Sequence, residues 1–211
     1  MIKAILFDFD GTIVDSDHVT FLEFVNLMKN YKYPVPTNEQ LLKFRGLPAI
    51  EIIKKLHPQL SDQKVQEMYE FKNINADRFM PKIKLFPNVN NVLKKLSSKF
   101  KLAVVTSRRR RGVNLLLKQH HLEELFLVTI TKDDVVNFKP HAEGILKAIK
   151  MLKIEMDESV YVGDAEADVA TANNAGITCV LISKDKEDYG AKFHLSEIIK
   201  LPLLIKKMYE K

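Results

Sequence analysis

The chain has 211 residues, 46% hydrophobic and 28% charged, a balance typical of one large soluble domain or of a domain with a smaller insertion. Its formal net charge of +6 favours anionic partners such as phosphate esters or nucleic acid. We expect neither a membrane span, since no apolar run approaches roughly 18 residues, nor a signal peptide, since Asp8 and Asp10 interrupt the first apolar stretch.

The first predicted element is a buried strand at Ala4–Phe7, which ends in Asp8, Phe9, Asp10 and Gly11. Side chains alternate along an extended chain, so Asp8 and Asp10 point the same way. Their charges repel, so we expect a cation between them or a shared proton, and Mg2+ suits carboxylate oxygens. This segment predicts a metal-dependent site with a nucleophile; a plain polar exit from the strand is the alternative.

No convincing strand follows between Ser16 and about Ile83. Apolar residues recur there at helical spacing, for example Phe24 and Met28, and prolines punctuate the segment. Glu67–Met80 is also predicted as a helix. We therefore predict a helical cap domain at residues 15–83, inserted into a core of residues 1–14 and 84–211.

Four further apolar runs predict strands, and amphipathic segments between them predict helices. The strands are expected at Leu102–Val105, Leu125–Ile130, Val160–Val162 and Cys179–Ile182. The helices are expected at Val89–Leu96, Gly112–Gln119, Ala142–Leu152 and Ala165–Ala175. This alternation predicts an α/β fold, a Rossmann-like parallel sheet with helices on both faces. The single cysteine, Cys179, is expected to be a buried thiol, and a reducing cytoplasmic location follows by default.

Polar residues follow these runs at the edge where parallel sheets bind ligands. Thr106 and Ser107 follow the run Leu102–Val105. Asp164 comes after the run Val160–Val162, and Asp168 lies four residues further, able to face the same side. Lys139 lies between the runs Leu125–Ile130 and Val160–Val162.

Together these groups match the needs of phosphoryl transfer. One carboxylate can attack phosphorus, and a second can protonate the leaving oxygen and later deprotonate water. Mg2+ offsets the repulsion between carboxylate and phosphate, and a hydroxyl and an ammonium hold the phosphoryl oxygens.

Four segments resemble, in order, the signatures of the haloacid dehalogenase-like superfamily, and the resemblance covers nearly the whole chain. They are Asp8–Thr12, Val105–Ser107, Lys139–Pro140 and Gly163–Asp168. The helical insertion resembles the type-1 cap of the phosphoglycolate phosphatase-like branch.

The resemblance implies Asp8 as nucleophile and Asp10 as general acid and base. It implies Mg2+ held by Asp8, the Asp10 backbone carbonyl and Asp164, with Asp168 in a supporting position. It also implies that Thr106 and Lys139 bind the phosphoryl group, with Ser107 beside them. Because dehalogenases and phosphonatases lack an acid at the position of Asp10, this residue argues for hydrolysis of a phosphoester or phosphoanhydride.

The predicted function is a Mg2+-dependent phosphatase that acts on a small phosphorylated metabolite through an aspartyl-phosphate. A β-phosphoglucomutase-like phosphotransferase remains an alternative, since it shares Asp8 and Asp10. A basic nucleic-acid-binding protein is a second alternative, supported only by net charge and by Arg108–Arg111, which we expect to be a solvated helix start. No partner other than the substrate is expected, and the protein is expected to be a monomer or a homodimer.

The substrate is left open by the core, because core residues hold only the phosphoryl group that all candidates share. Arg45, in a loop of the cap, is the best candidate for contact with the leaving group, although a surface arginine in a plain turn fits as well. Phosphoglycolate, pyrophosphate, a sugar phosphate and a nucleoside monophosphate all remain possible.

Overall fold

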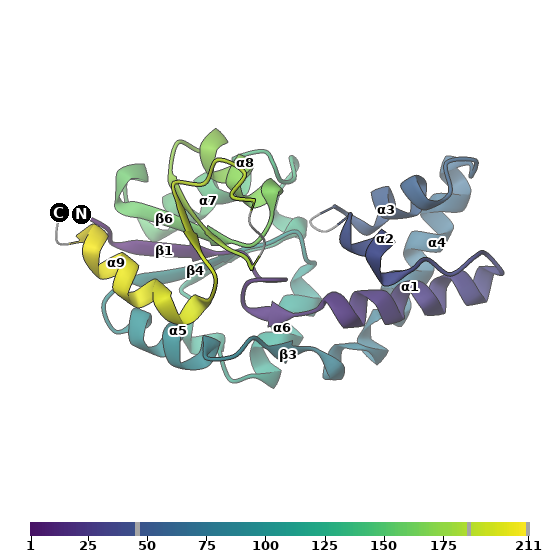
Figure 1. Ribbon diagram of the computed structural model, residues 1–211, viewed down its shortest axis with the longest axis horizontal. Helices are drawn as coiled ribbons and strands as arrows, with labels where there is room; N and C mark the ends of the chain where they lie inside the picture. Colours follow the sequence, from purple (N-terminus) through teal and green to yellow (C-terminus); the bar gives the residue numbers. More distant parts are fainter. Residues whose placement is uncertain (45–46, 185–186, 210–211) are drawn as a thin grey trace. The chain divides into compact units, whose positions relative to one another are not determined.

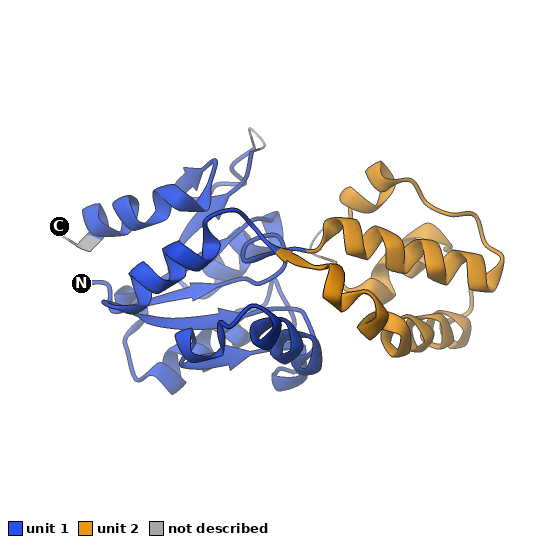
Figure 2. Ribbon diagram, turned by 90° about the horizontal axis from the view of Figure 1, so that it is seen from below, with its two compact units in different colours: residues 1–15, 85–211 blue, residues 16–84 orange. Residues whose placement is uncertain are grey.

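The computed structural model describes residues 1–44, 47–184 and 187–209. They form two compact units (Figure 2): unit 1 comprises Met1–Asp15 and Leu85–Lys211, and unit 2 comprises Ser16–Lys84. The insertion predicted from the sequence, residues 15–83, starts and ends one residue before unit 2. Each unit has a hydrophobic core of its own, described in turn below.

Within the described residues, unit 1 is built on a six-stranded parallel sheet with the order β5-β4-β1-β6-β7-β8. The strands are β1 (Ala4–Phe7), β4 (Lys101–Val105), β5 (Val128–Ile130), β6 (Ser159–Gly163), β7 (Thr178–Ile182) and β8 (Phe193–Leu195). Near-continuous apolar sequence in the inner strands is typical of a sheet covered on both faces. The predicted α/β class with a parallel sheet is confirmed.

Helices cover both faces of this sheet (Figure 1). On one face lie α7 (Glu143–Leu152) and α8 (Glu166–Asn174), and on the other α5 (Val89–Ser97) packs beside α9 (Leu201–Tyr209). A fifth helix, α6 (Arg110–Gln119), connects β4 to β5. Side chains alternate along the strands, so Leu6, Ala103 and Tyr161 join the core beneath α7 and α8.

The order of the strands reverses direction at β1. From β1 the chain continues outward to β4 and β5, and then crosses to β6, β7 and β8 on the other side. Ligands of open α/β sheets bind at such a switch point, beyond the carboxyl ends of the strands. The residues that follow β1, β4 and β6 therefore lie together at the carboxyl edge of the sheet.

Several elements differ from the prediction. β5 begins at Val128 rather than Leu125, because Glu123–Leu125 form a 3-10 turn before the strand. β8 was not predicted, since its three residues carry His194 in the middle and form no apolar run. α9 was also missed.

The described part of unit 2 is built mainly from helices joined by loops. It contains α1 (Asp17–Tyr31), α2 (Asn38–Leu42), α3 (Ala49–Leu56) and α4 (Asp62–Asn75), followed by 3-10 turns at Ala76–Arg78 and Met80–Lys82. Its core includes Phe24 and Met28 from α1 and Met68 from α4. The helix predicted at Glu67–Met80 instead starts after the Ser61 N-cap, whose hydroxyl accepts from Lys64 N, and it ends at Asn75.

The chain leaves and re-enters unit 1 at neighbouring points. β2 (Val14–Asp15) and β3 (Lys84–Leu85) pair in a separate two-stranded sheet. Next to it, Phe86 N donates a hydrogen bond to Ile13 O at 3.1 Å. The insertion is thus anchored by two adjacent chain segments.

Candidate active site

Asp8 is the first residue after β1 and is buried at the carboxyl edge of the sheet. Its backbone N–H donates to Val162 O in β6 at 2.8 Å, so the strand pairing extends to Asp8. Its Oδ1 accepts a hydrogen bond from Lys139 Nζ at 2.5 Å. Burial raises the pKa of Asp8 from 3.8 to about 7, while the Lys139 ammonium acts in the opposite direction. Asp8 is therefore poorly solvated and faces a cation.

Lys139 connects Asp8 to Asp168. Its Nζ donates to Asp168 Oδ1 at 2.7 Å and lies 5.2 Å from the centre of the Tyr161 ring. The Tyr161 hydroxyl lies 3.2 Å from the same Asp168 oxygen and 3.0 Å from Val105 O. Burial opposes the lysine charge, but Asp168 and Asp8 outweigh burial and raise the pKa of Lys139. Lys139 is therefore a fixed ammonium between two carboxylates.

Asp168 also shapes the loop that carries Asp164. Its Oδ2 accepts hydrogen bonds from Asp164 N at 3.1 Å and from Ala165 N at 3.2 Å. Gly163 allows this close approach, because a Cβ there would lie 2.4 Å from the Asp168 Cβ. On the other side, Thr12 Oγ1 donates to Asp164 Oδ1 at 3.2 Å. Thr12, in the loop after β1, thus orients the Asp164 carboxylate, while Asp168 of α8 holds the Asp164 backbone.

The carboxylates of Asp8, Asp164 and Asp168 fit a divalent cation. Each offers one oxygen, the three oxygens lie within 4.8 Å of one another, and all three residues are buried. Hard oxygen donors of this kind suit Mg2+. Asp168 also accepts hydrogen bonds from Lys139 and from two backbone N–H groups, one of them Asp164 N.

Gly11 provides the space for Asp164, and its replacement tests this arrangement. Its φ is +84°, and a Cβ there would lie 2.1 Å from Asp164 Oδ2. Gly176 has a similar φ of +70° with no atom within 4 Å of a Cβ. We expect Gly176→Ala to lose about 1–2 kcal/mol of unfolding free energy from backbone strain alone, and Gly11→Ala about 2 kcal/mol more. Urea denaturation measures both; equal losses would contradict the clash with Asp164.

Asp10 forms a bidentate ion pair with Arg108. Arg108 Nε donates to Asp10 Oδ2 at 2.8 Å, and Nη2 donates to Oδ1 at 2.5 Å. The prediction that Arg108 belongs to a solvated helix start is wrong, because its side chain is only 16% exposed. In this structure Asp8 and Asp10 each face a cationic side chain, Lys139 and Arg108 respectively.

Arg108 is the site residue that the sequence interpretation missed. It belongs to a run of four arginines, which resembles a charged surface. A usable signal was its position two residues after Thr106, at the carboxyl end of β4, which lies next to β1. Arg110, by contrast, pairs with Asp134 in the loop that precedes Lys139.

The phosphoryl-binding candidates lie on the β4 side. Thr106 is 6% exposed, its N–H donates to Ile130 O at 3.0 Å, and its Oγ1 accepts from Arg108 N at 3.1 Å. Thr106, Ser107 and Lys139 line one pocket. Arg45 lies outside the described residues, so its predicted contact with the leaving group stays a prediction.

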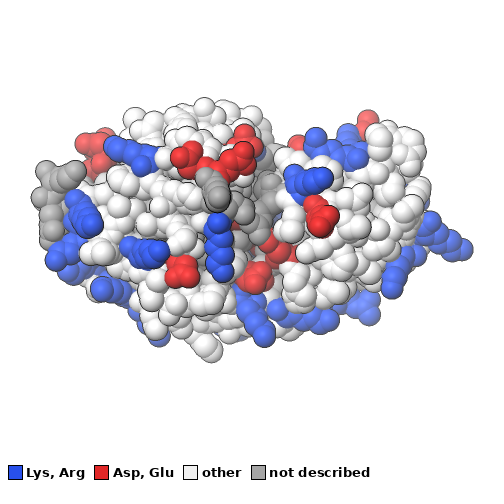
Figure 3. All heavy atoms as spheres, in the orientation of Figure 1, with Lys and Arg blue, Asp and Glu red and all other residues white. Residues whose placement is uncertain are grey.

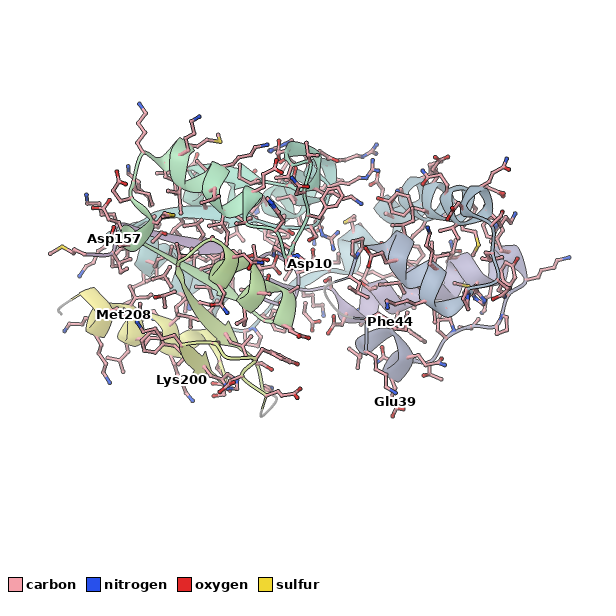
Figure 4. The ribbon with its side chains drawn as sticks, turned by 90° about the horizontal axis from the view of Figure 1, so that it is seen from above. Asp10, Glu39, Phe44, Asp157, Lys200 and Met208 are labelled. Atoms are coloured by element: carbon pink, nitrogen blue, oxygen red, sulfur yellow. The ribbon has the colours of Figure 1, made fainter. Side chains whose placement is uncertain are left out.

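One face of the molecule shows acidic and basic side chains together. On the face drawn in Figure 3, Lys and Arg side chains are spread out with Asp and Glu among them. In Figure 4, Asp10 lies at the end of unit 1 opposite Asp157, which precedes β6.

Among the described residues, no helix is both long enough and apolar enough to span a bilayer.

The site thus gathers acids from the loops after β1 and β6, a hydroxyl after β4 and a buried lysine at the carboxyl edge of the parallel sheet. The haloacid dehalogenase-like hydrolase family matches residues 5–182, and the chain belongs to this family. The protein is accordingly an enzyme, a hydrolase of phosphoric ester bonds.

One curated relative agrees with this assignment, and two solved structures share the fold. Pyrophosphatase PpaX of Anoxybacillus flavithermus is 32% identical over 176 residues, which cover 83% of this chain and 80% of the relative. A protein of Bacteroides fragilis assigned to the haloacid dehalogenase-like hydrolases has the same fold, with a TM-score of 0.89, 24% identity, and coverage of 95% of this chain and 100% of that one. A predicted phosphoglycolate phosphatase of Haemophilus somnus gives a TM-score of 0.87 at 19% identity, covering 97% and 98% of the two chains.

Proposed function

We propose that the protein is a Mg2+-dependent phosphatase that hydrolyses a small phosphorylated metabolite through an aspartyl-phosphate on Asp8. The observation that carries this proposal is the buried Asp8 carboxylate, held by Lys139 and grouped with Asp164 at the switch point of the sheet. When bound, Mg2+ supplies positive charge that lowers the repulsion between carboxylate and phosphate.

In the first half-reaction an Asp8 oxygen attacks phosphorus. The bond between phosphorus and the leaving oxygen breaks, and Asp10 gives its proton to that oxygen. Lys139 and Thr106 hold the phosphoryl oxygens, whose charge spreads in the transition state. In the second half-reaction Asp10 takes a proton from water, the water oxygen attacks phosphorus, and the bond to Asp8 breaks.

The relatives direct the choice of first substrates. One curated relative is a pyrophosphatase and one structural neighbour is a predicted phosphoglycolate phosphatase. Pyrophosphate and phosphoglycolate should therefore lead a panel that also contains sugar phosphates and nucleoside monophosphates. If the phosphoryl group appears on a second sugar hydroxyl instead of as free phosphate, a phosphotransferase of the β-phosphoglucomutase kind replaces the phosphatase.

Metal dependence is the direct test of the proposed mechanism. We expect excess EDTA to lower phosphate release by at least about 100-fold, because the repulsion between Asp8 and the phosphate is then uncompensated. Adding Mg2+ back in excess should restore the rate, while adding Na+ at equal ionic strength should not. Full activity in EDTA would contradict the role of the Asp8 and Asp164 carboxylates as metal ligands.

A further inference from the structure

Arg108 pairs with Asp10, the residue proposed to protonate the leaving group. Asp10 is the proposed acid and base, yet both of its carboxylate oxygens accept hydrogen bonds from the Arg108 guanidinium. A bidentate pair of this kind occupies both oxygens in a fixed geometry. To act as the acid, Asp10 must carry a proton on one oxygen, and a protonated carboxyl cannot accept from both donors of the fork, so the pair must open during turnover.

The position of Arg108 is built into unit 1. Its N–H donates to Thr106 Oγ1 at 3.1 Å, and its carbonyl accepts from Lys132 N at 3.1 Å. Its side chain passes over Gly112, where a Cβ would lie 3.3 Å from Arg108 Cδ. The two adjacent positions in the run behave differently: Arg109 and Arg111 are exposed. The backbone thus directs one arginine of the run, and not its exposed neighbours, toward Asp10.

Opening the pair has a different cost for different substrates. Separating two half-buried, hydrogen-bonded charges is unfavourable unless each finds a new partner. A leaving group with its own negative charge offers the guanidinium a new partner and leaves Asp10 for the scissile oxygen. A neutral leaving group offers none.

We propose that Arg108 binds the leaving group, and that the substrates are phosphorylated compounds with a second anionic group beside the scissile bond. Pyrophosphate and phosphocarboxylates such as phosphoglycolate have this chemistry; simple alkyl phosphates do not. The proposal rests on the proposed phosphatase function. In the reaction Arg108 transfers its hydrogen bonds from Asp10 to the leaving-group anion, and Asp10 then protonates the leaving oxygen as the bond to phosphorus breaks.

Arg108→Gln tests this role, with Arg111→Gln as the matched control for loss of one charge from the same run. The substrates are pyrophosphate, phosphoglycolate, and 2-hydroxyethyl phosphate, which replaces the carboxylate of phosphoglycolate by an alcohol. The ratio of wild-type to variant kcat/KM is taken for each substrate separately, so intrinsic reactivity cancels. We expect Arg108→Gln to lower kcat/KM about 10- to 100-fold for the anionic substrates and less than about 3-fold for 2-hydroxyethyl phosphate. Arg111→Gln should change none of them by more than about 3-fold.

A binding measurement makes the test independent of turnover. In an Asp8→Asn background, calorimetry compares pyrophosphate with inorganic phosphate, which fills only the phosphoryl site. Adding Arg108→Gln should weaken pyrophosphate binding about 10-fold or more and phosphate binding less than about 3-fold. Equal weakening of both ligands, or equal loss of kcat/KM on charged and neutral substrates, would overturn the leaving-group role. If the wild type releases phosphate from no substrate, the proposed function fails by itself, and the binding comparison still decides the role of Arg108.

Discussion

Replacing Asp8 by asparagine is expected to abolish turnover while leaving the protein folded. The amide has the same size but cannot form an aspartyl-phosphate, so phosphate release should fall by at least about 10^4-fold. Phosphate release in Mg2+ measures the effect. Asp157→Asn, the same change at an exposed residue before β6, is the control and should retain full activity. Retained activity in Asp8→Asn would refute Asp8 as nucleophile.

The Asp8→Asn variant also tests how the charge of Asp8 affects the stability of the fold. Burial raises the pKa of Asp8 from 3.8 to about 7, so the folded protein holds this proton more tightly than the unfolded chain. Ionising Asp8 therefore removes stability as the pH rises from about 4 to about 7, with no further change above. In EDTA at pH 8, Asp8→Asn should melt at the same or a higher temperature than the wild type. A markedly lower melting temperature would show that the charge of Asp8 stabilises the fold.

Replacing Lys139 by methionine is expected to have the largest effect on stability. Lys139 donates to Asp8 and Asp168, and its loss leaves these buried carboxylates beside Asp164 without an ammonium. Breaking a buried ion pair from one side costs about 3–5 kcal/mol, so the free energy of unfolding in EDTA should fall by that amount. Activity should fall at least about 10^3-fold, because a phosphoryl-binding cation is gone.

Divalent metal and a surface variant control this experiment. Mg2+ should stabilise Lys139→Met more than it stabilises the wild type, because the metal replaces the missing positive charge. Lys3→Met removes an exposed partner of Glu158 and should leave the free energy of unfolding nearly unchanged. A Lys139→Met variant as stable as the wild type in EDTA would contradict the burial of charge at this site.

Much of the fold followed from sequence because the inner strands of this doubly wound sheet are almost continuously apolar. The runs ending at Phe7, Val105 and Gly163 each stop at polar residues, and parallel pairing then brings those residues together. β8 escaped prediction for the opposite reason. It contributes a half-buried segment with a histidine in the middle, so neither an apolar run nor a clear alternation marks it.

The site was predictable in its residues but not in its pairing. Asp8, Lys139 and Asp164 could be assigned from their places after strands, yet sequence does not say which cation faces which acid. That depends on backbone paths of separate loops. Arg108 reaches Asp10 only because Thr106 fixes its N–H and Gly112 leaves room for its stem. Four consecutive arginines look alike in sequence, whereas the path of the chain from β4 into α6 distinguishes them.

The hydrogen bond between Phe86 N and Ile13 O, next to the β2–β3 pair, has a consequence for how this enzyme can diverge. Relative to unit 1, residues Ser16–Lys84 are a single insertion whose two ends lie next to each other. The entropy of closing such an insertion depends only logarithmically on its length, at about 0.6 kcal/mol per doubling. Exchanging or enlarging the inserted helices therefore leaves the sheet and its carboxylates nearly undisturbed. The sequence of the insertion can therefore change during evolution while the residues of the site in unit 1 keep their positions.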